Sequence, residues 1–292
     1  ITDANALNLG ALNTGNLTVI ANASGTTGAL DLGHGIANGA LSATSNDGNV
    51  TQDGALTVTG ISGVDAGAGS ITLTQANNDF VGEVTLTGGT TQITDVNGLN
   101  LGALATGSLT VNSTGDLDLG NGTVGGDLSA TSNDGNITQD GTLAVTGAST
   151  IDAGVGTITL TQVANDFTGA VNLTGGESQV TDDNGLNLGV LNTGNLTVIA
   201  NAGGTTNDLD LGHGTVTGDL SATSNGGAVT QDGALTVVGT TAVNAGANTI
   251  TLTNPGNDFQ DTVALTNTDA NDVAITDVNA IDFAATSVGS GT

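Results

Sequence analysis

The chain has 292 residues, with 28 acidic residues and no lysine or arginine, so its formal charge at pH 7 is −28. Because proteins bind phosphate groups through lysine and arginine, this composition excludes nucleic acid and anionic lipid surfaces as partners. Cysteine is absent, so the fold uses no disulfides, and no apolar run approaches the ~20 residues that a membrane helix needs, which predicts no membrane insertion. Hydrophobic residues make up 37% of the chain, and their alternating arrangement argues against disorder.

The chain repeats itself from end to end. Sister stretches begin at Ile1 (ITDANALNLG), Ile93 (ITDVNGLNLG), Val180 (VTDDNGLNLG) and Ile275 (ITDVNAIDFA). These starts define repeats 1 to 3 at approximately 1–92, 93–179 and 180–274, followed by a partial repeat at 275–292. End-to-end repetition is typical of solenoids, so we interpret residues 1–292 as one continuous β-solenoid and as part of a longer chain.

Within a repeat, apolar and polar residues alternate over short segments, as in Val84–Leu86, Leu109–Val111 and Leu143–Val145. Alternation at period two predicts strands with one buried face, and the Gly, Asn and Asp clusters between them predict turns. The 87 residues from Phe80 to Asp166 divide into four such parts, of 23, 23, 21 and 20 residues. We therefore predict an all-β fold, a right-handed parallel β-helix (β-solenoid) with about three short strands per coil of 20–23 residues.

Two local features refine this prediction. Repeats 1 and 3 are five residues longer than repeat 2 in the second coil, where Ile20–Leu30 and Ile199–Leu209 stand against Val111–Leu117, which predicts a longer loop at one corner. Each repeat also contains an Asn-Asp-Phe triplet, and we predict that Phe80, Phe167 and Phe259 point into the core.

Few residues suggest chemistry. His34 and His213, the only histidines, both occur in Leu-Gly-His-Gly, where repeat 2 has Asn121. A metal ligand or general base is one interpretation, but neither histidine has a second histidine or a cysteine nearby in the sequence, and we favour an exposed turn residue.

Carboxylates also recur at fixed places, and calcium bound in turns is one interpretation of them. We favour capping of turns by side-chain bonds to backbone N–H groups. We assign no catalytic, cofactor-binding or metal residues, and Ca²⁺ stays open as an alternative. The recurring positions are Asp3, Asp95, Asp182 and Asp277; Asp53, Asp140 and Asp232; and Asp79, Asp166 and Asp258.

One resemblance covers essentially the whole chain. The segments that carry it are Asn165–Gly175, Asp182–Gly189, Gly194–Val198 and Ile137–Gly147. Their pattern resembles the repeat region of filamentous-haemagglutinin-like bacterial exoproteins, which are two-partner-secretion-type adhesins. The resemblance implies a long β-helical fibre that is exported through an outer-membrane partner and serves as an adhesin or a matrix component.

These observations lead to one functional expectation and two alternatives. We expect a structural extracellular fibre, the shaft of a bacterial surface adhesin or the subunit of an extracellular filament or matrix, located outside the cell or at its surface. Its expected partners are other copies of itself, through end-to-end or lateral association, and a host or neighbouring cell surface. The first alternative is a calcium- or carbohydrate-binding solenoid module. The second, less favoured, is a polysaccharide-degrading β-helix enzyme, and we expect no enzymatic activity.

Overall fold

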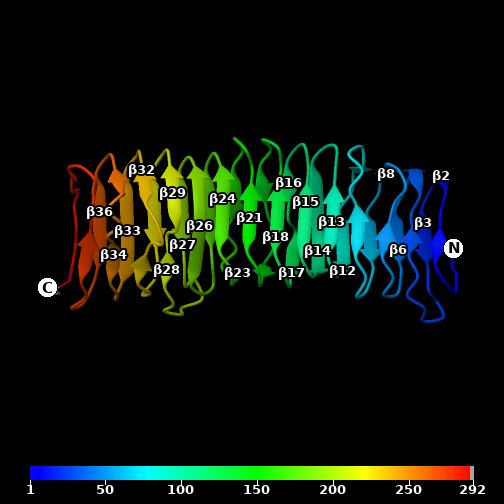
Figure 1. Cartoon of the computed structure of the whole chain (residues 1–292), viewed down its shortest axis with the longest axis horizontal. Helices are drawn as coiled ribbons and strands as arrows, with labels where there is room; N and C mark the ends of the chain where they lie inside the picture. Colours follow the sequence, from blue (N-terminus) through cyan, green and yellow to red (C-terminus); the bar gives the residue numbers. More distant parts are fainter. Residues whose placement is uncertain (290–292) are drawn as a thin grey trace. The chain divides into compact units, whose positions relative to one another are not determined.

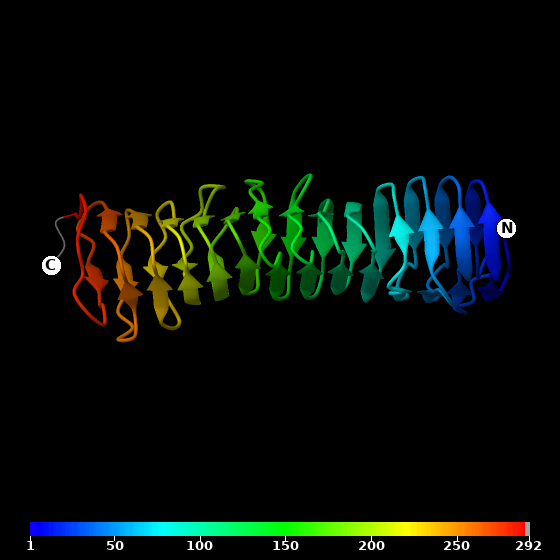
Figure 2. The ribbon, with the colours of Figure 1, turned by 90° about the horizontal axis from the view of Figure 1, so that it is seen from above.

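The computed structural model describes residues 1–289, and the described chain consists of short parallel strands, turns and loops, with no helix among these residues. It divides into two compact units, a first unit of residues 1–141 and a second unit of residues 142–292. In each unit, strands that are about one coil apart in sequence pair in parallel and lie side by side (Figure 1). Figure 2 shows the same stacking from a second side. Each unit is therefore a parallel β-solenoid.

The first unit has three stacks of strands. The first stack contains β3 (Leu17–Ile20), β6 (Leu41–Thr44), β9 (Ser62–Asp65), β12 (Val84–Gly88), β14 (Leu99–Thr106) and β17 (Asn121–Val124). The second contains β1 (Leu7–Asn8), β4 (Leu30–Asp31), β7 (Val50–Thr51), β10 (Ile71–Leu73), β13 (Thr91–Thr94), β15 (Leu109–Asn112) and β18 (Leu128–Thr131). The third contains β2 (Ala11–Thr14), β5 (His34–Ala37), β8 (Leu56–Val58) and β11 (Asp79–Phe80), and a further run joins β14 to β16 (Leu117–Asp118) and β19 (Ile137–Thr138).

The second unit has the same organisation. One stack contains β21 (Ser149–Asp152), β24 (Val171–Gly175), β26 (Leu186–Thr193), β29 (His213–Val216), β32 (Leu235–Val237) and β35 (Asp258–Phe259). Another contains β22 (Ile158–Leu160), β25 (Ser178–Thr181), β27 (Leu196–Ile199), β30 (Leu220–Thr223), β33 (Thr241–Gly246) and β36 (Val263–Asn267). The remaining strands are β20 (Leu143–Val145) paired with β23 (Asp166–Phe167), and β28 (Leu209–Asp210), β31 (Val229–Thr230), β34 (Ile250–Leu252) and β37 (Val273–Ile275), which follow on β26.

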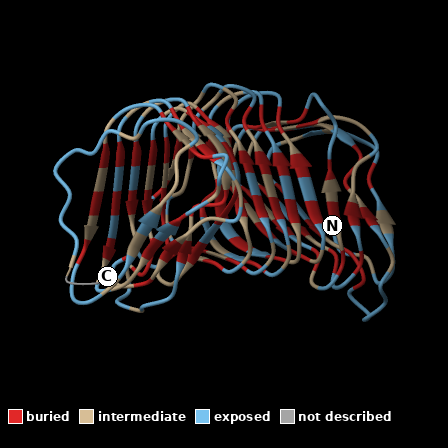
Figure 3. Ribbon diagram, turned by 60° about the vertical axis from the view of Figure 1, so that its left-hand side comes forward, coloured by how far each residue is buried: buried red, intermediate tan, exposed pale blue. Residues whose placement is uncertain are grey.

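The core confirms the alternation read from the sequence. Along most strands every second residue is buried, and Figure 3 shows this alternation of buried and exposed residues along the ribbon. Phe80, Phe167 and Phe259 are each only 1% exposed, so the prediction that they point inward is confirmed. Each large apolar side chain that is fully buried contributes about 1.5–3 kcal/mol.

Coil length departs furthest from the predicted 20–23 residues at one place in each unit. Leu7 pairs with Leu30, a step of 23 residues, whereas Thr91 pairs with Leu109, a step of only 18. The short coil contains β14, which pairs with β16 through its first residues and with β17 through its last ones. Between these halves the register with β12 shifts, because one residue near Gly102 has no partner. In the second unit, β26 shows the same shift against β24.

Because β14 belongs to two stacks, a repeat does not contain a whole number of coils. There are twelve strands from β3 to β14, and β14 counts as two strand segments because its two halves pair in different stacks, which gives thirteen segments. With three segments to a coil, one repeat takes four and a third coils instead of the four predicted. The equivalent strands β3 and β15 of repeats 1 and 2 consequently lie in different stacks. In the second unit, β21 and β33 are related in the same way.

Candidate functional site

The Asn-Asp-Phe triplets form buried polar corners. Asn78 has no exposed surface, and its Oδ1 accepts hydrogen bonds from the Leu56 backbone N–H at 2.9 Å and from the Gln52 side chain at 2.7 Å. Its Nδ2 donates to Gln52 Oε1 at 2.8 Å and to the Leu73 carbonyl at 3.1 Å. Asn257 makes the same four bonds, with Gln231 in place of Gln52. These amides therefore join neighbouring coils.

The aspartates of the Ile-Thr-Asp stretches complete the same corners. Asp95 accepts the backbone N–H of Phe80 on Oδ2 and that of Asn97 on Oδ1, each at 2.7 Å. Asp182 accepts the N–H groups of Phe167 and Asn184 at 2.7 and 2.8 Å. The prediction that these carboxylates cap turns is confirmed at both positions.

Burial makes the two capping carboxylates weaker acids than exposed aspartates. Asp95 is 1% exposed and Asp182 is fully buried. Burial raises the pKa of Asp95 above 3.8, and burial together with the nearby charges of Asp166 and Asp183 raises the pKa of Asp182 to about 6, against the two backbone bonds that lower it.

The two histidines each have a carboxylate partner on the next coil. His34 Nδ1 lies 2.7 Å from Asp53 Oδ1, and His213 Nδ1 lies 2.8 Å from Asp232 Oδ1. Both partners of each pair are about half exposed, as predicted, but His34 and His213 are the first residues of β5 and β29 and not turn residues. These pairs were not predicted from the sequence, although the separation of 19 residues between the partners is close to one coil and indicates such a contact.

The turn that precedes these histidines requires glycine on structural grounds. In repeat 2 the turn is Leu-Gly-Asn-Gly, and Gly120 has φ of +63°. A Cβ atom at this position would lie 2.1 Å from the carbonyl oxygen of Gly102 on the preceding coil. The glycine therefore allows close stacking of the coils. Packing alone explains why glycine recurs in all three turns, and no bound ligand is required to explain it.

A cation site is not evident from the geometry. Among residues 1–289, no group of three or more His, Cys, Asp or Glu side chains is placed to hold a metal ion. The same residues include no helix that is long and apolar enough to span a membrane. Calcium binding in turns stays a prediction.

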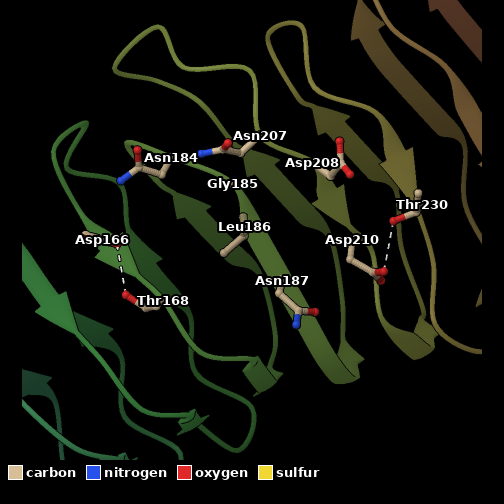
Figure 4. A pocket seen from close by; sticks show the side chains of 10 residues that line it. All are labelled: Asp166, Thr168, Asn184, Gly185, Leu186, Asn187, Asn207, Asp208, Asp210 and Thr230. Carbon is tan, nitrogen blue, oxygen red and sulfur yellow. Dashed lines mark hydrogen bonds between the residues drawn. The ribbon is translucent and has the colours of Figure 1, made fainter.

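The second unit contains an open polar groove of about 540 Å³ (Figure 4). Its lining comes from successive coils, with Asp166 and Thr168 on one, Asn184 and Asn187 on the next, Asn207, Asp208 and Asp210 on the third, and Thr230 on the fourth. On the floor, Asn187, Asp210 and Thr230 stack in register along β26, β28 and β31.

Two carboxylates of the groove are fixed by local hydrogen bonds. Asp210 Oδ1 accepts the Gly212 N–H at 2.8 Å, and its Oδ2 accepts the Thr230 hydroxyl at 3.0 Å. Asp208 Oδ1 accepts the Ala228 N–H at 3.1 Å. Asp208 Oδ2 has no such bond and is available to a ligand.

The loop that forms one wall of the groove is the five-residue insertion of repeat 3. Its buried Asn201 donates to the carbonyls of Asn207 and Ser224 at 2.7 and 2.5 Å, and it accepts the Thr205 hydroxyl and the Asn207 N–H at 2.7 and 3.0 Å. Asn22 organises the insertion of repeat 1 by equivalent bonds. The predicted corner loop is therefore confirmed, and it is held firmly.

Parallel coils stacked within each unit, together with a repeating sequence, define the class of repeat β-solenoids. The chain belongs to the family described as repeats of unknown function (DUF5649), whose model matches residues 20–87, 106–174 and 202–266, more than half of the chain. No curated protein and no solved structure matches the chain in the corresponding comparisons.

The groove is not evident from the sequence alone. Aspartate, asparagine and threonine face water throughout the chain, so composition does not single these residues out. The available signal was a difference between repeats: Thr168 stands where repeat 1 has Val81, and Asn207 stands where repeat 2 has Gly115.

Proposed function

We propose that the chain is a structural segment of an extracellular bacterial fibre, the shaft of a surface adhesin or the subunit of a filament or matrix. The observation that carries the proposal is how the recurring polar residues are used. Asn78 and Asn257 each make three side-chain hydrogen bonds to the preceding coil and one within their own coil, and Asp95 and Asp182 cap backbone groups. The asparagines and aspartates that recur in every repeat therefore make the hydrogen bonds that hold the coils together.

Three further points support this proposal. A solenoid grows by adding coils, so it extends a chain without requiring a new core. The resemblance to filamentous-haemagglutinin-like repeats favours export and a position at or outside the cell surface. The charge of −28 keeps neighbouring fibres apart unless cations or specific contacts bring them together.

In this proposal the chain acts mechanically and sterically, as a spacer, and its partners are other copies of itself and a host or neighbouring cell surface. It neither cleaves polysaccharides nor depends on a cofactor. Release of reducing sugars from a panel of polysaccharides by the purified chain would contradict the proposal.

Removal of one complete repeat tests the spacer role. Deletion of residues 93–179 joins Gln92 to Val180, where the sequence continues as it does at Ile93. Four and a third coils at ~4.8 Å each amount to about 21 Å, so electron micrographs should show a folded particle that is shorter by about that length.

A matched deletion of residues 93–169 provides the control, because it joins Gln92 to Ala170 and breaks the register of the repeat. We expect this variant to lose its β-sheet circular dichroism or to aggregate. If both deletions gave equally folded particles, or if the first one unfolded the chain, the repeat would not be the structural unit that the proposal requires.

A further inference from the structure

The groove in the second unit differs from the equivalent place in repeat 2, although most of its residues recur there. In repeat 2 the Asn97 amide donates to Asp79 Oδ1 at 3.2 Å, and in the partial repeat Asn279 donates to Asp258 Oδ1 at 3.0 Å. The structure gives no such bond between Asn184 and Asp166, and both side chains line the groove instead. The hydrogen bond between this asparagine and this aspartate, which forms at the two other places, is therefore not made in the groove.

Three amides in the groove are without an intramolecular partner. Among the described residues, the side chains of Asn184, Asn187 and Asn207 have no hydrogen-bond partner, and all three lie at the groove surface. Each amide offers two N–H donors and a carbonyl acceptor. Together with Asp208 Oδ2, they present donors and acceptors within one concavity of a size typical of ligand pockets.

We propose that this groove binds a pyranose sugar that is uncharged or carries an amino group. A sugar hydroxyl both donates and accepts, so it satisfies amide N–H groups and carboxylate oxygens at the same time. A bare cation would satisfy only the oxygens and leave the amide donors of Asn184, Asn187 and Asn207 unused.

Charge decides which sugars the groove accepts. Asp166, Asp208 and Asp210 line it, and the chain has no lysine or arginine to offset them. A uronate or a sulfated sugar would bring a second negative charge into this field and is excluded. An ammonium group on a sugar ring would instead form charge-assisted hydrogen bonds with the carboxylates.

The groove is also pre-organised. Two hydrogen bonds of Asn201, to the carbonyl and from the N–H of Asn207, hold the backbone of Asn207 before any ligand arrives. Asp210 is fixed by Gly212 and Thr230. Binding therefore costs little ordering of the wall or the floor. This inference goes beyond the spacer role, and a fibre without sugar binding would leave that role intact.

Isothermal titration calorimetry of the full chain tests the proposal with three hexasaccharides, of N-acetylglucosamine (uncharged), glucosamine (amino) and glucuronate (anionic). We expect saturable binding of the N-acetylglucosamine and glucosamine hexasaccharides and no binding of the glucuronate hexasaccharide. Added salt should lower the affinity for the glucosamine hexasaccharide. Absence of binding by both the uncharged and the amino hexamers, or binding of glucuronate as tight as theirs, would overturn the proposal.

Two matched double variants locate the binding. D208N/D210N keeps the Oδ1 acceptors for Ala228 and Gly212 but removes both charges from the groove, and it should weaken sugar binding about tenfold or more. D116N/D118N makes the same change in repeat 2, where Asp116 and Asp118 accept the same kinds of bonds, from Asn136, Gly120 and Thr138. It should leave affinity within about twofold.

Equal weakening by the two double variants would mean that the sugar responds only to the overall charge, which would refute the assignment to the groove. N207G installs the residue that repeat 2 has at Gly115 and keeps the backbone bonds to Asn201, so it should fold and still lose affinity. Retention of full affinity by both N207G and D208N/D210N, with circular dichroism unchanged, would likewise place binding elsewhere.

Discussion

The buried carboxylate of Asp182 should make the stability of the chain depend on pH in an unusual direction. Its pKa is raised from 3.8 to about 6 in the folded chain, chiefly by burial. Between about pH 4 and pH 6 the folded state keeps a proton that the unfolded state has released. This contribution to stability is therefore complete below about pH 4 and is lost as the pH rises through about 6.

The shift sets the expected magnitude. One pKa unit corresponds to about 1.4 kcal/mol, so a rise of about two units amounts to about 3 kcal/mol of unfolding free energy between pH 4 and pH 7. Because Asp182 is fully buried, screening by solvent does not reduce this figure much.

Comparison with Asp182→Asn isolates the effect of this one group. The asparagine retains one acceptor and loses the other, which lowers stability by about 1–3 kcal/mol at every pH, but it cannot titrate. Urea unfolding followed by far-UV circular dichroism at pH 4, 5, 6 and 7 should show that the wild type loses about 3 kcal/mol more than the variant over this range.

A neighbouring substitution supplies the control. Asp183→Asn removes the charge that contributes least to the raised pKa of Asp182, while burial, the largest cause, is unchanged. Asp182 therefore continues to titrate, and the pH profile of this variant should remain close to that of the wild type. The reasoning is refuted if the profiles of wild type and Asp182→Asn run parallel from pH 4 to pH 7.

Three other substitutions test the packing and the polar contacts. Asn257→Leu leaves two backbone groups and a glutamine amide without partners in the core, so urea unfolding should show a loss of about 3–6 kcal/mol. Thr241→Val removes a buried hydroxyl that has no hydrogen-bond partner, so it should raise stability by about 1 kcal/mol. Thr193→Val instead breaks the 2.8 Å hydrogen bond with the Ser178 hydroxyl and should lower stability by about 1 kcal/mol. His34→Asn installs the residue that repeat 2 already has and should change stability by less than about 1 kcal/mol, because the pair with Asp53 is exposed.

Each of these tests has a contrary outcome. A neutral Asn257→Leu would show that the corner amides do not hold the coils together. Equal effects of Thr241→Val and Thr193→Val would contradict the distinction between an unpartnered and a partnered hydroxyl. A loss of several kcal/mol in His34→Asn would mean that the exposed contact between His34 and Asp53 stabilises the fold.

The sequence was sufficient to predict the solenoid because alternation and turn residues are local signals. Period-two alternation and the spacing of turns were enough to predict strands such as the one at Leu109–Val111 and the inward orientation of Phe80. The 18-residue coil could not be predicted in this way. At Gly102 the alternation shifts by one residue, because Leu101 and Gly102 are both buried, and the pairing with β12 shows that one residue has no partner.

The candidate groove was harder to predict, because it depends on which polar side chains stay unbonded after folding. Asn97 and Asn184 occupy equivalent positions in the sequence, yet only Asn97 bonds to the neighbouring aspartate. Whether an amide is used internally is decided by contacts between coils. The difference between Asn207 and Gly115 was visible in the sequence, but only the structure places Asn207 beside the groove.

The extra third of a coil in each repeat has a consequence for recognition. In the first unit, the strands β3 and β15 carry the same sequence motif but look outward from different sides of the coil stack. Within that unit, a residue type that both strands carry is thus presented in two different directions. A ligand that approaches one side of the unit therefore meets only one of the two copies.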